Sequence, residues 1–292
     1  MSILFIRFPL DIKPAIPLRS FTQQSSDSPQ TVLYIGMSSP ARPENAIFEI
    51  ADGNVIHYIC QSDNYLTERD FDGELSPPEP VGSAKKGTAG AHLILQNKRA
   101  IYCLDEGNIL QDFEFDEDTA EWTPGQLASF GVEAAPDTKF ATVAHPEDET
   151  IYVFSQGSSG QIQALRGEHD WWGIVVGLPL TDPLPGASIH AVSVKGAIRV
   201  FYAHRDNSVH ELVLLEDGTW RDSQVPLTDS ASPKSHIVAW VESDECFLRF
   251  ADGNGSAWVL KDGELVLVGR LTENGFQPEG DAEGHGPKEL KW

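Results

Sequence analysis

The chain has 292 residues, 40% of them hydrophobic, and carries 44 acidic against 21 basic residues, for a formal net charge of −23. This length suits one large all-β domain or two small ones, and the charge argues against nucleic acids or anionic membranes as partners, because both bind basic surfaces. No run approaches the roughly 18 apolar residues of a membrane helix, and the N-terminus carries no recognisable signal peptide, so we expect a cytoplasmic protein.

Short β-rich runs separated by Gly, Asp, Asn, Ser and Pro follow one another along the chain, and helical periodicity is hard to find. The first 45 residues contain three strand candidates, at 3–8, 18–22 and 31–37. After them one hairpin pattern recurs five times, at residues 56–68, 100–112, 152–164, 199–211 and 247–259. The last residues of these hairpins (68, 112, 164, 211 and 259) are separated by 44, 52, 47 and 48 positions.

Each hairpin has a further strand before it, and a Trp-containing run often follows, so that four strands recur about every 48 residues. This period is the signature of a β-propeller blade. We therefore predict an all-β fold: a six-bladed β-propeller of four-stranded antiparallel blades in one domain, residues 1–276, with a polar tail at 277–292. The expected blades cover residues 1–45, 46–82, 90–134, 138–181, 187–229 and 234–272, with a connector at 76–90. A strand at 265–271 joins the N-terminal blade and closes the ring through the termini.

The hairpin at 198–215 carries an Arg and a Glu that suit ligand binding. If it turns about Arg205, Arg199 and Glu211 lie directly opposite each other, with Cβ atoms about 5 Å apart. A guanidinium and a carboxylate at this distance either neutralise each other or together bind the hydroxyl groups of a polar ligand.

The stretch IRVFYAHRDNSVHEL followed by Trp220, and the stretch AIYCLDEGNILQDFEF followed by EWTPGQL, resemble the repeats of the fungal fucose-specific lectins of the orange-peel-mushroom type. The resemblance covers about residues 46–272. It implies six blades with fucose sites between neighbouring blades. One blade would supply an Arg and a Glu, and the next blade a Tyr or Trp and a further Trp that stack on the sugar.

Residue by residue, most of the implied sugar sites are incomplete. The position of the Arg holds Ile56, Ala100, Tyr152, Arg199 and Phe247, and the position of the Glu holds Glu68, Asp112, Ala164, Glu211 and Val259. Only Arg199 and Glu211 form a complete pair, and the matching stretch of the next blade, residues 260–265, contains no aromatic side chain. Each lost hydrogen-bonding partner costs about 1–3 kcal/mol, so we expect a divergent family member with eroded sugar sites.

Apolar residues at former sugar-binding positions favour a lipophilic small molecule as ligand. Some fungal proteins similar to this propeller are cofactor-free cyclases of secondary metabolism, so our first hypothesis is a pericyclase of the hetero-Diels–Alder type that holds its reactants in place. The alternatives are a fucose- or glycan-binding lectin and a scaffold that binds another protein. The candidate catalytic residues are Glu68, Asp112 and Tyr152. The candidate ligand-binding residues are Arg199, Glu211, Glu68, Trp122, Trp171, Trp172 and Trp220.

We expect no metal and no cofactor. The nine histidines show no familiar ligand spacing, and the sequence has no phosphate-binding loop or dinucleotide fingerprint. The three cysteines lack CxxC spacing, and Cys60 and Cys103 lie in strand-like runs, which is typical of small core residues. The expected partner is a small-molecule or glycan ligand, and a homodimer is left open.

Overall fold

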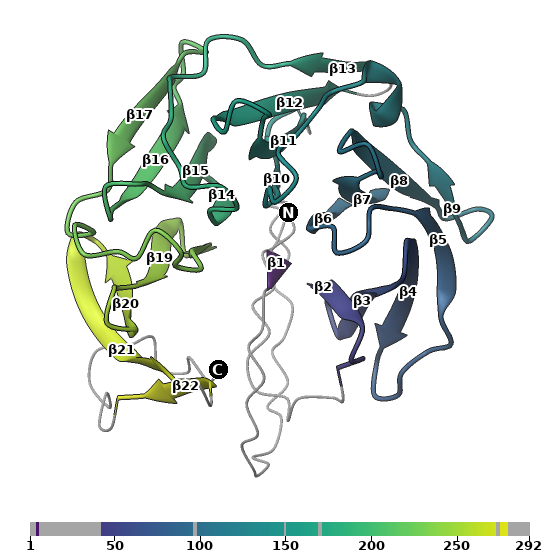
Figure 1. The fold of residues 1–292 in the computed structure, drawn as a ribbon, viewed down its shortest axis with the longest axis horizontal. Helices are drawn as coiled ribbons and strands as arrows, with labels where there is room; N and C mark the ends of the chain where they lie inside the picture. The colour runs from purple at the N-terminus through teal and green to yellow at the C-terminus, as the bar shows by residue number, and fades with distance from the viewer. Residues whose placement is uncertain are drawn as a thin grey trace.

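The computed structural model describes residues 4–5, 42–95, 98–148, 150–168, 171–272 and 275–279. In this part of the chain, five antiparallel sheets stand side by side around a common centre (Figure 1). Each sheet follows the preceding one in the sequence, and its strands are hydrogen-bonded in chain order. The fold is therefore an all-β propeller. The described residues contain no helix long and apolar enough to cross a membrane.

The sheets are numbered here in chain order, and their strands have the following bounds. The first sheet contains β1 (Leu4–Phe5), β2 (Ala46–Asp52), β3 (Val55–Ser62), β4 (Tyr65–Phe71) and β5 (Glu79–Ser83). The second contains β6 (Gly90–Leu95), β7 (Lys98–Leu104), β8 (Leu110–Asp116) and β9 (Glu121–Pro124), and a 3-10 helix, η1 (Leu127–Phe130), follows it. The third contains β10 (Ala141–Ala144), β11 (Ile151–Gln156), β12 (Ile162–Glu168) and β13 (Trp171–Ile174). The fourth contains β14 (Ile189–Val194), β15 (Ala197–Ala203), β16 (Val209–Leu214) and β17 (Trp220–Gln224). The fifth contains β18 (Val238–Glu242), β19 (Glu245–Ala251), β20 (Ser256–Lys261), β21 (Glu264–Thr272) and β22 (Gly275–Pro278).

The strands β2, β6, β10, β14 and β18 line the inside of the ring, and each contacts the next in this order; β1 pairs with the inner edge of β2 and lies nearer the centre (Figure 1). All residues of β11 and β14 are buried, and most of them are apolar; the polar exceptions are Ser155 and Gln156 of β11 and His190 and Ser193 of β14. Apolar clusters fill the spaces between successive sheets, from the first with the second to the fourth with the fifth. Among the described sheets the core is thus divided into four interfaces, and a site between two of these sheets lies in one of them.

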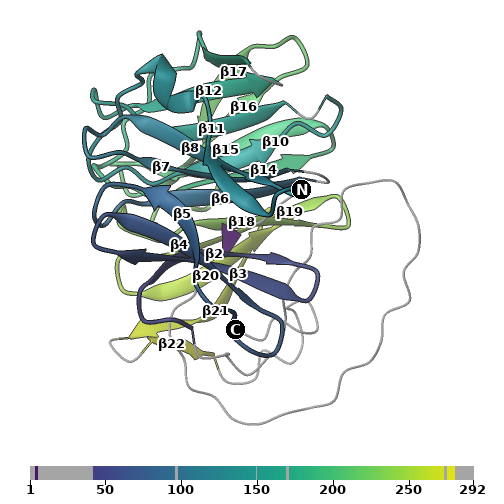
Figure 2. The same ribbon diagram turned by 90° about the vertical axis from the view of Figure 1, so that its right-hand side faces the viewer.

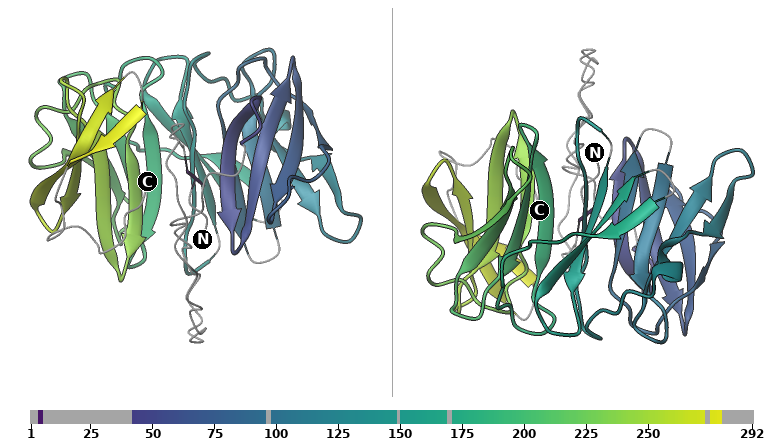
Figure 3. Two further views of the ribbon diagram at one scale, coloured as in Figure 1. Left: turned by 90° about the horizontal axis from the view of Figure 1, so that it is seen from below. Right: turned by 90° about the horizontal axis from the view of Figure 1, so that it is seen from above.

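The number of sheets differs from the predicted six blades, since the described residues form five. The strand predicted at 265–271 to close the ring is β21, which pairs with β20 and β22 and so belongs to the fifth sheet. Leu4–Phe5, within the first strand candidate, pairs with β2 in the first sheet. The candidates at 18–22 and 31–37 lie outside the described residues. In the side view the first and fifth sheets overlap at one end of the ring (Figure 2), and in the views from below and above they stand on the two sides of the picture (Figure 3).

Two segments expected to be irregular contain strands. The predicted connector at 76–90 includes β5, and Pro80 is tolerated there because β5 is the edge strand of its sheet. A Cβ atom on Gly82 of β5 would lie 2.1 Å from the Phe113 ring, so this glycine permits the close approach of the first sheet to the second. At the C-terminus, Gln277 and Pro278 belong to β22 rather than to a tail. The remainder of the predicted tail, beyond Glu279, lies outside the described residues.

Candidate ligand-binding site

The complete Arg–Glu pair lies on one face of the fourth sheet. Arg199 of β15 pairs across the strands with Val213, and Glu211 of β16 pairs with Phe201. The prediction that Arg199 and Glu211 are directly opposite is therefore wrong. Five residues separate the paired Ala203 and Val209, so the hairpin is centred on Asp206 and the two side chains are diagonal neighbours on one face. They nevertheless meet, since Arg199 Nε donates a hydrogen bond to Glu211 Oε1.

This pair is charged and partly open to solvent. Burial alone would lower the pKa of Arg199, but the hydrogen bond and the charge of Glu211 outweigh burial and raise it. The Arg199 side chain is 32% exposed and that of Glu211 is 11% exposed. Among the described residues, Arg199 hydrogen-bonds only Glu211, through Nε, so its two terminal nitrogens are available to a ligand.

The fifth sheet provides the opposite wall of this interface. Leu260, Leu265, Cys246 and Trp258 pack in the same apolar cluster as Phe201, which is the cross-strand partner of Glu211. Trp122 and Trp220 pair with Phe115 and Leu214, which lie three residues after Asp112 and Glu211. The residue three positions after Val259 is Asp262, which lies in the turn between β20 and β21, so the outer strand of the fifth sheet has no counterpart of these tryptophans, and Leu265 pairs with Leu260 instead.

The interface between the first and second sheets holds another carboxylate, Glu68, in a different environment. Trp122 Nε1 donates to Glu68 Oε2 at 2.9 Å, and Arg99 Nη1 donates to Oε1 at 3.3 Å. Glu68 is 2% exposed, and the Arg99 guanidinium lies 3.7 Å from the centre of the Phe115 ring. An Arg, a Glu and a Trp are therefore present here, but the Arg comes from the second sheet and the groups bind one another.

The residue of the first sheet that takes the position of Arg199 is His57, and the assignment of Ile56 to this position is wrong. Glu68 pairs with Ile59, and His57 lies diagonal to Glu68 on the same face, with Nδ1 3.4 Å from Oε1. The reason is the turn: Ser62 pairs with Tyr65 across two residues, whereas the fourth sheet uses five. A fixed spacing of 12 residues therefore selects the wrong neighbour.

His57 bonds most closely to Asp70, with Nδ1 2.7 Å from Oδ1. Arg99 Nη1 is 3.1 Å from the same nitrogen, but the shorter bond to a carboxylate places the proton on Nδ1. Burial alone would lower the pKa of His57, but the hydrogen bonds to Asp70 and Glu68 outweigh it and raise the pKa to about 9. His57 is therefore a cation at neutral pH.

Asp112, at the interface between the second and third sheets, stabilises a loop. Its Oδ1 accepts a hydrogen bond from the Leu127 amide at 2.9 Å, and its carbonyl oxygen accepts one from Gly125 at 2.9 Å. A Cβ atom on Gly125 would lie 2.2 Å from Asp112 Oδ2, so the backbone closes over the carboxylate. Trp172 of the third sheet packs edge-on against Tyr102, with ring centroids 5.9 Å apart.

Aromatic rings fill the interface between the third and fourth sheets. Tyr152 stands at the position of the Arg, and Trp220 packs edge-on against both Tyr152 and Phe154, at centroid distances of 6.1 and 5.8 Å. Burial raises the pKa of the Tyr152 hydroxyl. Trp171 lies elsewhere, 57% exposed on β13. The candidate residues are thus brought together in pairs, Glu68 with Trp122, Tyr152 with Trp220 and Arg199 with Glu211, but are spread over four interfaces rather than one site.

A propeller with an Arg–Glu pair at one inter-sheet position and tryptophans at three equivalent positions has the features of a lectin-like β-propeller. A family model described as fungal fucose-specific lectin matches residues 78–251, which is more than half of the chain. The chain therefore belongs to the fungal fucose-specific lectin family.

Two curated relatives are fucose-specific lectins. That of Aleuria aurantia is 27% identical over 148 residues, covering 48% of this chain and 45% of the relative. That of Aspergillus fumigatus is 27% identical over 188 residues, covering 61% and 56%. The matches thus span about half the length of these relatives.

Solved structures support the fold. AofleA from Arthrobotrys oligospora superposes with a TM-score of 0.64 at 23% identity, over 75% of this chain and 68% of that one. The Aleuria aurantia lectin, described as a six-bladed β-propeller, superposes with a TM-score of 0.59 at 20% identity, over 75% and 74%.

Proposed function

We propose that this protein binds glycans, fucosides first among them, through Arg199 and Glu211 between the fourth and fifth sheets. The observation that carries the proposal is that this Arg–Glu pair is complete, charged and partly exposed in a member of a lectin family. Relatives have been solved with such ligands: the Aleuria aurantia lectin with α-methyl-L-fucoside, and the SapL1 lectin with α-methyl fucoside.

The pair offers a sugar complementary groups. The terminal nitrogens of Arg199 would donate to sugar oxygens, and a Glu211 oxygen would accept from a hydroxyl group, both as charge-assisted hydrogen bonds. The C–H face of the ring would contact the part of the wall that Leu260 and Leu265 form, where the fifth sheet lacks the outer-strand tryptophan that β9 and β17 carry. Because aromatic packing adds about 0.5–1.5 kcal/mol beyond area burial, we expect weak binding to a single sugar.

Calorimetric titration with α-methyl-L-fucoside, supported by a glycan array, tests the proposal. We expect saturable binding that Arg199→Ala and Glu211→Gln abolish. Arg166→Ala is the matched control, because Arg166 pairs with Glu168 on the surface of the third sheet at 3.3 Å. Absence of binding to every glycan, or binding that survives Arg199→Ala, would overturn the proposal.

The hypothesis of a lipophilic ligand and a hetero-Diels–Alder type of cyclisation stays a prediction, and the family membership favours glycan binding over it. Its best location is the interface of Tyr152, Phe154 and Trp220, where the three rings already pack on one another. Titration with a fluorescent apolar dye tests it: binding that Trp220→Ala alters would support the hypothesis, and no binding would count against it.

We also propose that residues 1–45 contribute to a sixth blade that completes the ring. Support comes from the two end sheets, which carry apolar clusters on the faces that point away from the other described sheets. These are Ile56, Tyr58 and Cys60 on the first sheet, and Val238, Trp240, Phe247 and Val259 on the fifth. Deletion of residues 1–41 should lower the Tm strongly, whereas deletion of residues 281–292 should not. Equal Tm values for both deletions would contradict a sixth blade.

A further inference from the structure

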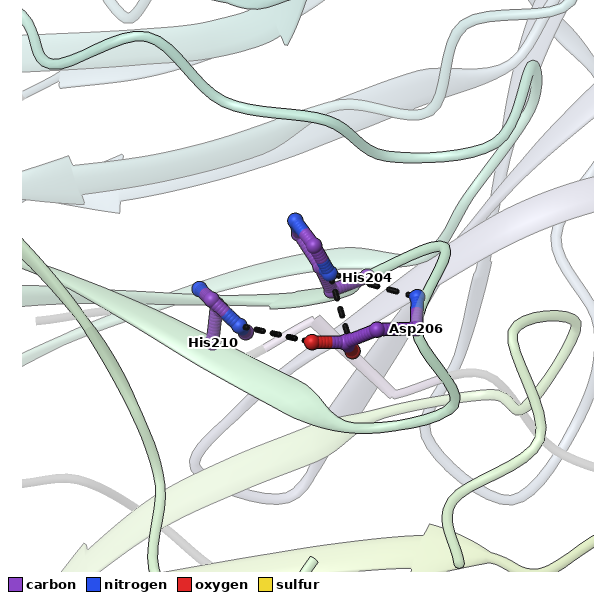
Figure 4. Close-up of side chains that lie close together, drawn as sticks. All are labelled: His204, Asp206 and His210. Carbon is purple, nitrogen blue, oxygen red and sulfur yellow. Dashed lines mark hydrogen bonds and ion pairs between the residues drawn. The ribbon is translucent and has the colours of Figure 1, made fainter. Parts of the chain in front are cut away.

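A cluster of two histidines and an aspartate lies at the end of the fourth sheet, away from Arg199. His204 and Asp206 belong to the loop that joins β15 to β16, and His210 is the second residue of β16. Asn207, between them, has a φ of 68°, a left-handed conformation that turns the chain back on itself. The three side chains point toward one another (Figure 4).

The distances within this cluster are short. His204 Nδ1 is 2.9 Å from Asp206 Oδ1, and His210 Nε2 is 3.6 Å from Asp206 Oδ2. One ligand atom from each of the three side chains lies within 4.8 Å of the other two. Tetrahedral zinc, with bonds of about 2.0–2.1 Å, separates its ligand atoms by about 3.3 Å, a value that falls between the two measured distances.

Ring nitrogens and a carboxylate converge on the centre of the cluster. His204 Nδ1 lies 2.9 Å from Asp206 Oδ1 and 3.3 Å from the Asp206 amide. Without a metal, a proton on this nitrogen satisfies the carboxylate. Because metal ligands bind in their deprotonated form, a metal ion would take the place of that proton.

A second carboxylate orients His210 from behind. Asp222 Oδ2 is 3.1 Å from His210 Nδ1, and because a carboxylate only accepts, Nδ1 carries the proton. The other oxygen of Asp222 accepts from the Tyr202 hydroxyl at 3.0 Å, which fixes the carboxylate. The lone pair of His210 is thereby placed on Nε2. This atom is buried and, within the part of the chain that the structure describes, has no hydrogen-bond partner.

We propose that His204, Asp206 and His210 bind a divalent transition-metal ion such as Zn²⁺, with Asp222 and Tyr202 as the supporting residues. Two imidazoles and a carboxylate suit zinc, copper or nickel rather than calcium or magnesium. A carboxylate behind a ligating histidine is the usual arrangement around such ions. The two rings, now 15° from parallel with centroids 3.9 Å apart, need only tilt toward each other. Asp206 is 49% exposed, which leaves a coordination position open to water or a ligand.

A similar group, His57 with Glu68 and Asp70, is a poor site for a cation. The Arg99 guanidinium lies 3.1 Å from His57 Nδ1, and Trp122 and Arg99 already occupy the oxygens of Glu68. Within the described part of the chain, no Arg or Lys pairs with His204, Asp206 or His210, and the neighbouring Arg205 pairs with Asp182 at 3.1 Å instead. The two groups therefore differ in the one property that decides whether a metal can enter.

The test is titration of the chelator-treated full chain with ZnCl₂ by calorimetry, and with Co²⁺ followed by its visible absorption. We expect one saturable site. His210→Gln and His204→Gln should each weaken binding at least tenfold and remove the absorption band. Asp222→Asn should weaken binding about 10–100-fold while keeping the band, as expected for a positioning residue.

The matched control is His145→Gln, which removes a histidine paired with Asp148 at 3.3 Å on another sheet and should leave the affinity unchanged. Thermal unfolding of each metal-free variant shows that it folds. If His210→Gln fails to fold, His204→Gln, on the exposed loop, decides the question. No saturable Zn²⁺ binding by the wild type, or binding unchanged by both histidine substitutions, would overturn the proposal.

Discussion

The first and fourth inter-sheet interfaces both contain a Glu bonded to an Arg, but the Glu–Arg pair is buried at the first interface and partly exposed at the fourth. At the first interface, between the first and second sheets, Glu68 is bonded by Trp122, Arg99 and His57 and is 2% exposed. At the fourth interface, between the fourth and fifth sheets, Glu211 is bonded by Arg199, and the Arg199 side chain is 32% exposed. An Arg, a Glu and a Trp close to the sugar-binding positions of the lectin family are therefore not sufficient for a sugar site. The Glu must have hydrogen-bonding capacity left for a ligand.

The largest expected effect comes from removing the carboxylate at each interface. Glu68→Ala leaves Arg99 and His57 buried without their shared partner, and losing one member of a buried ion pair costs about 3–5 kcal/mol. Glu211→Ala leaves a partly exposed Arg199, and exposed pairs contribute about 1 kcal/mol or less. Urea unfolding of both variants should show this difference, and equal losses would contradict the contrast between the interfaces.

The next effect is a pH dependence confined to the first interface. Since the pKa of folded His57 is about 9, against an ordinary value of 6.5, its charge stabilises the fold fully below about pH 6.5. This contribution, up to about 3 kcal/mol, is lost as the pH rises through about 9. Urea unfolding at pH 6 and pH 10 should show a larger fall for the wild type than for His57→Gln. If the wild type and His57→Gln lose the same stability between pH 6 and pH 10, His57 is not charged in the folded protein.

A smaller effect is expected from a single indole hydrogen bond. Trp122→Phe keeps an aromatic ring but removes the donor to Glu68, and a hydrogen bond to a charged group contributes about 1.5–3 kcal/mol. The control is Trp258→Phe, which removes a 3.1 Å bond to the less buried Asp252. Thermal unfolding should show the larger fall in Tm for Trp122→Phe. The reverse order would contradict a first interface in which Glu68 is buried and fully hydrogen-bonded.

The smallest expected effect is a gain of affinity at the fourth interface. Leu265→Trp adds a tryptophan to the wall beside the Arg–Glu pair, two residues along the strand from the position that Trp122 and Trp220 hold elsewhere. Aromatic packing of about 1 kcal/mol corresponds to about fivefold tighter binding of α-methyl-L-fucoside. Leu214→Trp at the third interface, where Tyr152 replaces the Arg, should give no gain. If Leu265→Trp does not tighten binding, the missing tryptophan is not what limits the fourth interface.

The repeat in the sequence was sufficient to predict the propeller, because strand patterns and turn residues depend on local chemistry. It failed where the length of a turn decides which residues meet. The turn of the first hairpin consists of Asp63 and Asn64, and Asp63 has a φ of 53°. Gln61 and Leu66, the counterparts of Ala203 and Val209, are separated by four residues instead of five, so His57 rather than Ile56 takes the position diagonal to Glu68.

Sequence comparison could not assign Arg99 to the site of Glu68 for another reason. Arg99 lies on the second sheet but reaches back to Glu68 on the first, so no repeat-by-repeat alignment assigns it to that site. The cluster of His204, Asp206 and His210 was missed because its spacing matches no familiar metal motif. It forms only when the loop folds the two histidines onto each other.

The position of Cys246 makes the reactivity of its thiol a probe of the fourth interface. Cys60 and Cys103 are buried, whereas Cys246 is partly exposed and packs in the cluster beside the Arg–Glu pair. Burial raises the pKa of its thiol to about 11, so alkylation will be slow at neutral pH and faster in alkaline buffer. The rate at which a small thiol reagent modifies Cys246 thus reads out the occupancy of this interface, because a bound sugar would shield the sulfur.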